Sequence, residues 1–186
     1  NLVIDIGAKS KDELTGKFKI GDIISFATRS RIYRGIFSGK AIDDRVGCYI
    51  ILNLLKRKWN FQLYAVFSVQ EEVGLRGIRT AAFRISPDYA FVIEGTTAGD
   101  LPGEEDVSPS TELGKGPAIT VIDRSAIGSR ILIDKLEKTA DRYRIPYQYK
   151  RTVTGGTDTA MIQRTKAGIH SVTVSVPVRY LHSPVS

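Results

Sequence analysis

Apolar and polar positions alternate along the chain in stretches that predict strands and helices in turn. From about residue 35 onward, continuous apolar runs typical of buried strands are separated by stretches whose apolar residues recur every three or four positions, which is the helical spacing. The clearest helical stretch ends just before Pro146. This pattern predicts helices at 43–58, 75–83 and 126–144, and strands at 61–69, 88–93, 118–122, 147–153 and 169–176.

Alternating strands and helices predict the α/β fold class, with a mostly parallel mixed sheet and helices on both faces. The first 30 residues follow a different pattern, in which two short strand-like stretches, 2–8 and 20–28, flank a polar piece that is turn-like or a short helix. We therefore assign residues 1–30 to the tail of a small β unit and residues 31–186 to the α/β domain. The Arg- and Ser-rich stretch 29–34 is expected to cross between them.

Composition narrows the function classes. The chain has 186 residues and a net charge of +7, but its Lys and Arg residues are scattered and form no nucleic-acid motif, so we expect no nucleic-acid partner. No apolar run reaches the length of a membrane span, so we expect no membrane partner either. The single cysteine, Cys48, lies in an apolar stretch and is interpreted as a core residue. One cysteine also suits a reducing, cytoplasmic compartment.

Polar side chains stand where the predicted strands end or where the first α/β helix begins. In open α/β sheets, ligands bind outside the carboxyl ends of the strands, so these residues are expected to meet at one edge. Carboxylates and imidazoles are ligands suited to Zn²⁺, Co²⁺ or Mn²⁺. The candidates come from four segments: Asp43 and Asp44, Glu71 and Glu72, Glu94, and His182.

Each candidate also has a structural interpretation. Asp43 or Asp44 could cap the helix that follows them, and Glu94 could satisfy a helix N-terminus. Adjacent glutamates are usually a solvated surface feature. Four independent positions at one predicted edge nevertheless favour a metal site. His170, at the opposite end of the last strand, is expected to lie outside it.

A glycine-rich loop, GGTD at 155–158, follows another predicted strand on the same expected edge. Such a loop lets backbone amides approach a substrate closely, so Gly156, Thr157 and Asp158 are candidate substrate-binding residues. Asp158 could orient the substrate or cap the following helix, and the sequence leaves both open. The loop lacks the lysine and the spacing of a nucleotide-binding P-loop.

Six strings together carry a specific family resemblance, although each alone would be weak. The chain resembles the tetrahedral (TET) aminopeptidases over nearly its whole length. This family includes deblocking, glutamyl and lysyl aminopeptidases, and some members carry an endoglucanase label. The strings are GKAIDDRVG (39–47), VFSVQEEVGLRG (66–77), VIEGTTAGDLPG (92–103), LGKGPAI (113–119), GGTDTAMI (155–162) and VPVRYLHSP (176–184).

The resemblance implies a dinuclear metallo-aminopeptidase that hydrolyses N-terminal residues from peptides. It implies two divalent ions, Zn²⁺ or Co²⁺ with Mn²⁺ possible, bridged by Asp43. Glu72 would bind one ion, Glu94 and His182 the other, and Glu71 would be the general base. Family members contain an inserted PDZ-like β domain through which they join as dimers, and residues 1–30 resemble the C-terminal part of that domain. The dimers of the family assemble into dodecamers in the cytoplasm.

One departure bears on this set. The family's remaining ligand is the histidine of a His-x-Asp motif, whereas the two histidines of this chain are His170 and His182. We therefore interpret the chain as an internal piece that lacks that segment and a C-terminal helix. The alternatives are a glycoside hydrolase, which needs two carboxylates flanking a sugar bond, and a non-catalytic peptide-binding module. Sugar-binding aromatic platforms are few, since Trp59 is the single tryptophan.

Overall fold

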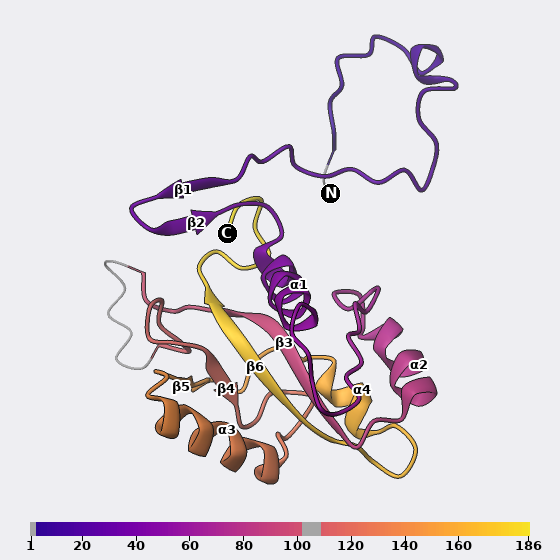
Figure 1. Cartoon of the computed structure of the whole chain (residues 1–186). Helices are drawn as coiled ribbons and strands as arrows, with labels where there is room; N and C mark the ends of the chain where they lie inside the picture. Colours follow the sequence, from indigo (N-terminus) through magenta and orange to yellow (C-terminus); the bar gives the residue numbers. More distant parts are fainter. Residues whose placement is uncertain (1–2, 102–108) are drawn as a thin grey trace.

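A computed structural model describes residues 3–101 and 109–186 (Figure 1). A 3-10 helix at Asp12–Leu14 precedes the β1–β2 hairpin, and helices and strands then alternate. The helices are α1 (Ile42–Leu55), α2 (Arg76–Ile85), α3 (Arg130–Tyr143) and α4 (Thr159–Gln163). The strands are β1 (Arg31–Tyr33), β2 (Ile36–Ser38), β3 (Tyr89–Thr97), β4 (Ala118–Thr120), β5 (Gln148–Tyr149) and β6 (His170–Val178).

The central sheet has four strands in the order β3-β6-β4-β5. β3 and β6 run parallel in a continuous register from Tyr89 opposite His170 to Thr97 opposite Val178. β4 pairs antiparallel with β6, and β5 pairs parallel with β4. The sheet is therefore mixed, with two parallel pairs and one antiparallel pair, which confirms the predicted α/β class.

Helices cover both faces of this sheet, as predicted. On one face, Val92 of β3 packs with Ile78 of α2 and Ile162 of α4. On the other face, Val172 of β6 packs with Leu132 and Ile133 of α3. Both sets are buried, and alternate side chains of a strand point to opposite faces, so one sheet supplies two apolar layers.

The N-terminal strand predictions are wrong where the structure describes them. Residues 3–30 contain the 3-10 helix and otherwise no regular element, and apolar side chains such as Ile20 and Ile23 remain exposed because no strand pairs with them. Stretch 29–34 is not a simple crossover, since β1 begins at Arg31. Arg34 and Gly35 both have positive φ, which is what a tight two-residue hairpin turn requires. The boundary at residue 30 stays a prediction.

The predicted strand at 61–69 is also wrong. Within the described residues this segment makes no ladder, and Phe61, Phe67 and Val69 are exposed. Its residues line a cavity of about 1510 Å³ together with Phe91 and other residues of β3, whose single sheet neighbour is β6. A strand forms only against a partner edge. The apolar pattern of this segment therefore produced no strand.

Leu132 and its neighbour Ile131 offer a matched test of the core beneath α3. Leu132 is 1% exposed and Ile131 is 50% exposed. Replacing Leu132 with Ala should lower the free energy of unfolding by about 2–5 kcal/mol, because the change removes buried contacts and leaves a cavity. Ile131→Ala should change it by less than about 1 kcal/mol. Urea unfolding measures both values, and equal losses would contradict the assigned packing.

Candidate active site

Three of the predicted ligands meet in one group. The Nε2 atom of His182 lies 3.2 Å from Oε2 of Glu72 and 3.5 Å from Oδ2 of Asp43. One ligand atom from each of these residues lies within 4.8 Å of the others, a spacing that suits a metal ion. The three come from the start of α1, the turn before α2 and the turn after β6. The tertiary structure therefore gathers residues 139 positions apart, counted from 43 to 182.

A glycine on β3 lets Asp43 enter this group. The backbone N–H of Gly95 donates to Oδ1 of Asp43 at 3.2 Å. A Cβ atom at position 95 would lie 2.9 Å from Cβ of Asp43, which is closer than real side chains approach. Only glycine therefore lets the beginning of α1 sit directly on the strand.

The adjacent Asp44 has a different role. Its Oδ1 accepts a hydrogen bond from the backbone N–H of Gly47 at 3.0 Å, so Asp44 caps the regular part of α1. This bears out the capping interpretation for Asp44. Asp43, in contrast, points to His182.

Glu71 and Glu72 lie on a turn and not at the end of a strand. The carbonyl of Glu71 accepts hydrogen bonds from the N–H groups of Gly74 at 3.0 Å and Leu75 at 2.8 Å. Gln70, just before the pair, has a φ of 56°, which redirects the backbone. Glu72 reaches His182, while the half-buried Glu71 lies among neighbouring carboxylates.

The electrostatic potential at the site is strongly negative, because several carboxylates lie close together. Burial first, and then the charges of Asp158, Glu72, Asp43 and Asp44, together raise the pKa of Glu71 to about 7. Burial likewise raises the pKa of Asp44 to about 7. Such shifts mean that the folded chain disfavours this much negative charge. A bound cation would relieve both desolvation and repulsion, so the residues present fit a divalent metal ion.

Glu94 is buried and is not one of the three residues that meet around His182. The predicted strand ended before it, whereas β3 continues through it to Thr97. The Glu94 side chain lines the same cavity as Asp43, Glu71 and Asp158. Burial raises its pKa to about 10, with Glu71 the largest charge contribution. Its role as a ligand stays a prediction.

The GGTD loop reaches this region by an unexpected route. It was expected at the same edge because it follows a strand, but β5 runs antiparallel to the β3–β6 pair through β4. The loop instead crosses a face of the sheet. Oδ2 of Asp158 accepts a 2.6 Å hydrogen bond from Ser68, three residues before Glu71. No side-chain hydrogen bond caps α4 among the residues that the structure describes, which argues against the capping interpretation of Asp158.

The other loop residues face inward. Oγ1 of Thr157 lies 2.9 Å from Oγ1 of Thr173 and donates to Oδ2 of Asp123 at 3.3 Å, all within the buried interior. Gly156 passes close to Ser125, where an added Cβ would lie 3.0 Å from Oγ. These contacts fix the shape of the loop. The substrate contacts of Gly156, Thr157 and Asp158 stay predictions.

His170 lies outside the site, as expected. It occupies the first position of β6, at the end opposite His182, and its Nδ1 lies 3.1 Å from Oγ of Ser129. The sequence pattern assigns no role to two further residues beside the site, Asp100 and Arg179. Both fall within the family-like strings, which was the available signal.

The chain belongs to the M42 glutamyl aminopeptidase family, whose model matches residues 1–186. A protein of Acetivibrio thermocellus that carries an aminopeptidase name is 42% identical over 186 residues, which cover 99% of this chain and 56% of that protein. An aminopeptidase structure from the archaeon Desulfurococcus kamchatkensis superposes with a TM-score of 0.92 at 40% identity, covering 97% of this chain and 52% of that one.

A TET1 peptidase structure from Pyrococcus horikoshii is 35% identical, with a TM-score of 0.79 and coverage of 97% of this chain and 54% of that one. It is described as assembling into a tetrahedron or a large octahedral shell. The chain thus spans about half the length of the relatives it matches. In residues 3–101 and 109–186, no helix is long and apolar enough to cross a membrane.

The raised pKa of Glu71 predicts the pH dependence of the metal-free protein. The folded pKa of about 7 exceeds the ordinary 4.5, so the folded state binds this proton more tightly than the unfolded state. The resulting stabilisation is complete below about 4.5 and is lost as the pH rises through about 7. With EDTA present, Glu71→Gln should therefore reduce the fall in melting temperature between pH 5 and pH 8. Thermal unfolding at both pH values measures it.

Glu13→Gln, a change at an exposed glutamate, is the control and should leave the pH dependence as in the wild type. An unchanged dependence in Glu71→Gln would contradict the assigned environment.

Proposed function

We propose that the complete protein is a metal-dependent aminopeptidase that hydrolyses N-terminal residues from peptides. The observation that carries this proposal is the meeting of Asp43, Glu72 and His182 at one edge of the sheet, with Glu71 beside them. Membership of the M42 family supports the same activity. The cytoplasmic location stays a prediction.

The meeting of Asp43, Glu72 and His182 supports the binding of a divalent cation, and the family resemblance implies a second cation. Two oxygen donors and one nitrogen donor suit Zn²⁺ or Co²⁺, and Mn²⁺ less well. We propose Asp43 as the ligand shared by two ions, with Glu72 on one ion and Glu94 and His182 on the other. Divalent cations, when bound, would lower the pKa of the attacking water and polarise the scissile carbonyl.

The residues of the chain then divide the remaining work. Glu71 takes a proton from the water while the water oxygen attacks the scissile carbonyl carbon. The same carboxyl group delivers that proton to the amine nitrogen as the C–N bond breaks. Asp158, held by Ser68 beside Glu71, would orient the substrate, and the backbone of Gly156 and Thr157 would approach it closely.

The proposed assembly is a homo-oligomer built from dimers, up to a dodecamer. Support comes from the shells formed by the similar Pyrococcus horikoshii peptidase. Peptides are the proposed substrates. No nucleic acid or membrane partner is proposed.

Replacing Glu71 with Gln tests the base assignment in the complete protein. Turnover of aminoacyl chromogenic substrates should fall by about 10²–10⁴-fold, because the amide cannot accept the proton. The affinity for Co²⁺, measured by titration calorimetry, should stay within a few-fold of the wild type. Glu13→Gln, at an exposed position, provides the control. Turnover at the wild-type rate in Glu71→Gln would eliminate Glu71 as the base.

Metal removal separates the proposed function from the two alternatives. The proposal predicts that chelation abolishes peptidase activity and that Zn²⁺, Co²⁺ or Mn²⁺ restores it. Cleavage of cellulose without metal would instead establish a glycoside hydrolase. Peptide binding without turnover of any substrate would establish a binding module.

A further inference from the structure

The position of His182 is not explained by packing around its own side chain. The side chain is 63% exposed, and its ring contacts are with Asp43 and Glu72. The backbone of its turn is also unusual, since Tyr180 has a φ of 56° and His182 a φ of 59°. Residues other than glycine adopt this left-handed conformation uncommonly and at an energetic cost, which neighbouring contacts have to offset. The turn therefore depends on how its two ends are held.

One end is held next to α1. Ser186 and Gly39 exchange two backbone hydrogen bonds, of 2.9 and 3.0 Å, four residues before Asp43. Within the turn, the N–H of Ser183 donates to the carbonyl of Tyr180 at 3.2 Å. These contacts join the far side of the turn to the segment that carries Asp43.

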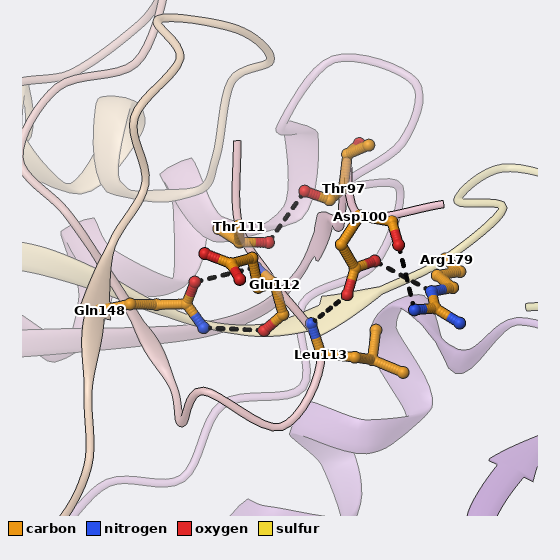
Figure 2. Close-up of polar contacts among 7 residues, drawn as sticks. All are labelled: Thr97, Asp100, Thr111, Glu112, Leu113, Gln148 and Arg179. Carbon is orange, nitrogen blue, oxygen red and sulfur yellow. Dashed lines mark hydrogen bonds and ion pairs between the residues drawn. The ribbon is translucent and has the colours of Figure 1, made fainter. Parts of the chain in front are cut away.

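The other end is held by an ion pair between Asp100 and Arg179. Nε of Arg179 donates to Oδ1 of Asp100 at 2.9 Å, and Nη2 donates to the backbone carbonyl of Asp100 at 3.2 Å. Oδ2 of Asp100 accepts the N–H of Leu113 at 2.8 Å, so both carboxylate oxygens are engaged (Figure 2). The side chains are 17% and 29% exposed, so water screens the pair only in part.

Asp100 is itself part of a larger set of polar contacts. The N–H of Ala98 donates to the carbonyl of Val178 at 2.9 Å, which extends the β3–β6 contact beyond the paired strands. Thr111 donates through Oγ1 to the carbonyl of Thr97 at 2.9 Å. Figure 2 shows the Thr111–Thr97 contact together with the Asp100–Arg179 pair. Asp100 thus presents a fixed carboxylate to the first residue after β6.

We propose that the Asp100–Arg179 pair is a positioning pair that fixes His182 for metal binding. The guanidinium reaches both a carboxylate oxygen and a carbonyl of one residue, which sets its orientation as well as its distance. Arg179 is three residues from His182, so a change in its position is transmitted to the turn. The proposal rests on the proposed function, because it assumes that His182 is a metal ligand.

Asp100→Asn tests the proposal with little change in shape, because the amide retains one oxygen but loses the charge that pairs with Arg179. Asp134→Asn is the matched control, since it removes the Arg130 ion pair of 2.7 Å on α3, away from the site. His182→Ala is the reference for complete loss of the ligand. Co²⁺ affinity by calorimetry and the visible Co²⁺ spectrum are measured on each protein.

We expect Asp100→Asn to weaken Co²⁺ binding by about 10–100-fold and to alter the spectrum, as loss of an outer partner of a metal ligand does. In the metal-free protein, amide hydrogen exchange across residues 180–183 should become at least about 10-fold faster. Asp134→Asn should match the wild type in all three measurements. Arg179→Lys should fall between, because a lysine cannot form both contacts of the guanidinium.

Two results would overturn the proposal and are distinguishable. Wild-type Co²⁺ affinity or wild-type exchange in Asp100→Asn, alongside weakened binding in His182→Ala, overturns the positioning role and leaves the metal site intact. Unchanged Co²⁺ affinity in His182→Ala removes His182 from the site, and the proposed ligand set then fails together with the positioning pair.

Discussion

The parallel pairing of β3 with β6 is the constraint on which the site depends. The nine-residue register brings the carboxyl ends of both strands to one edge, with Thr97 opposite Val178. Gly95 then lies where Asp43 can reach it, and the turn after β6 carries His182 back to Asp43. A shift of this register by one residue would turn the side chains of β6 to the opposite faces and move the turn that carries His182.

The same arrangement concentrates negative charge in a chain whose net charge is +7. Burial and mutual repulsion raise the pKa values of Asp44, Glu71 and Glu94. A fold that gathers carboxylates in this way sacrifices stability at that place, which is typical of sites arranged for binding and not for packing. The two buried apolar layers on the faces of the sheet have to supply the stability that the site does not.

Segment 61–69, which lies beside β3, shows that an apolar run alone does not predict whether a segment forms a strand. The segment has the composition of a buried strand, and it precedes Glu71 and Glu72 as the family resemblance requires. Among the described residues, however, it finds no partner edge, and its aromatic side chains line the large cavity beside β3. Backbone hydrogen bonding, which the side-chain pattern does not encode, decides whether such a segment becomes a strand.

The sequence by itself determined the α/β class, the positions of α1, α2, α3, β3 and β6, and the residues that meet around His182. Apolar periodicity is local, and the family-like strings keep their order along the chain. Only the tertiary structure decided that β5 runs antiparallel to β6, that Glu94 lines one cavity with Asp43, and that Asp100 pairs with Arg179, 79 residues away. These relations depend on the direction of each strand and on which polar groups remain unpaired after packing. The spacing of residues along the sequence determines neither of them.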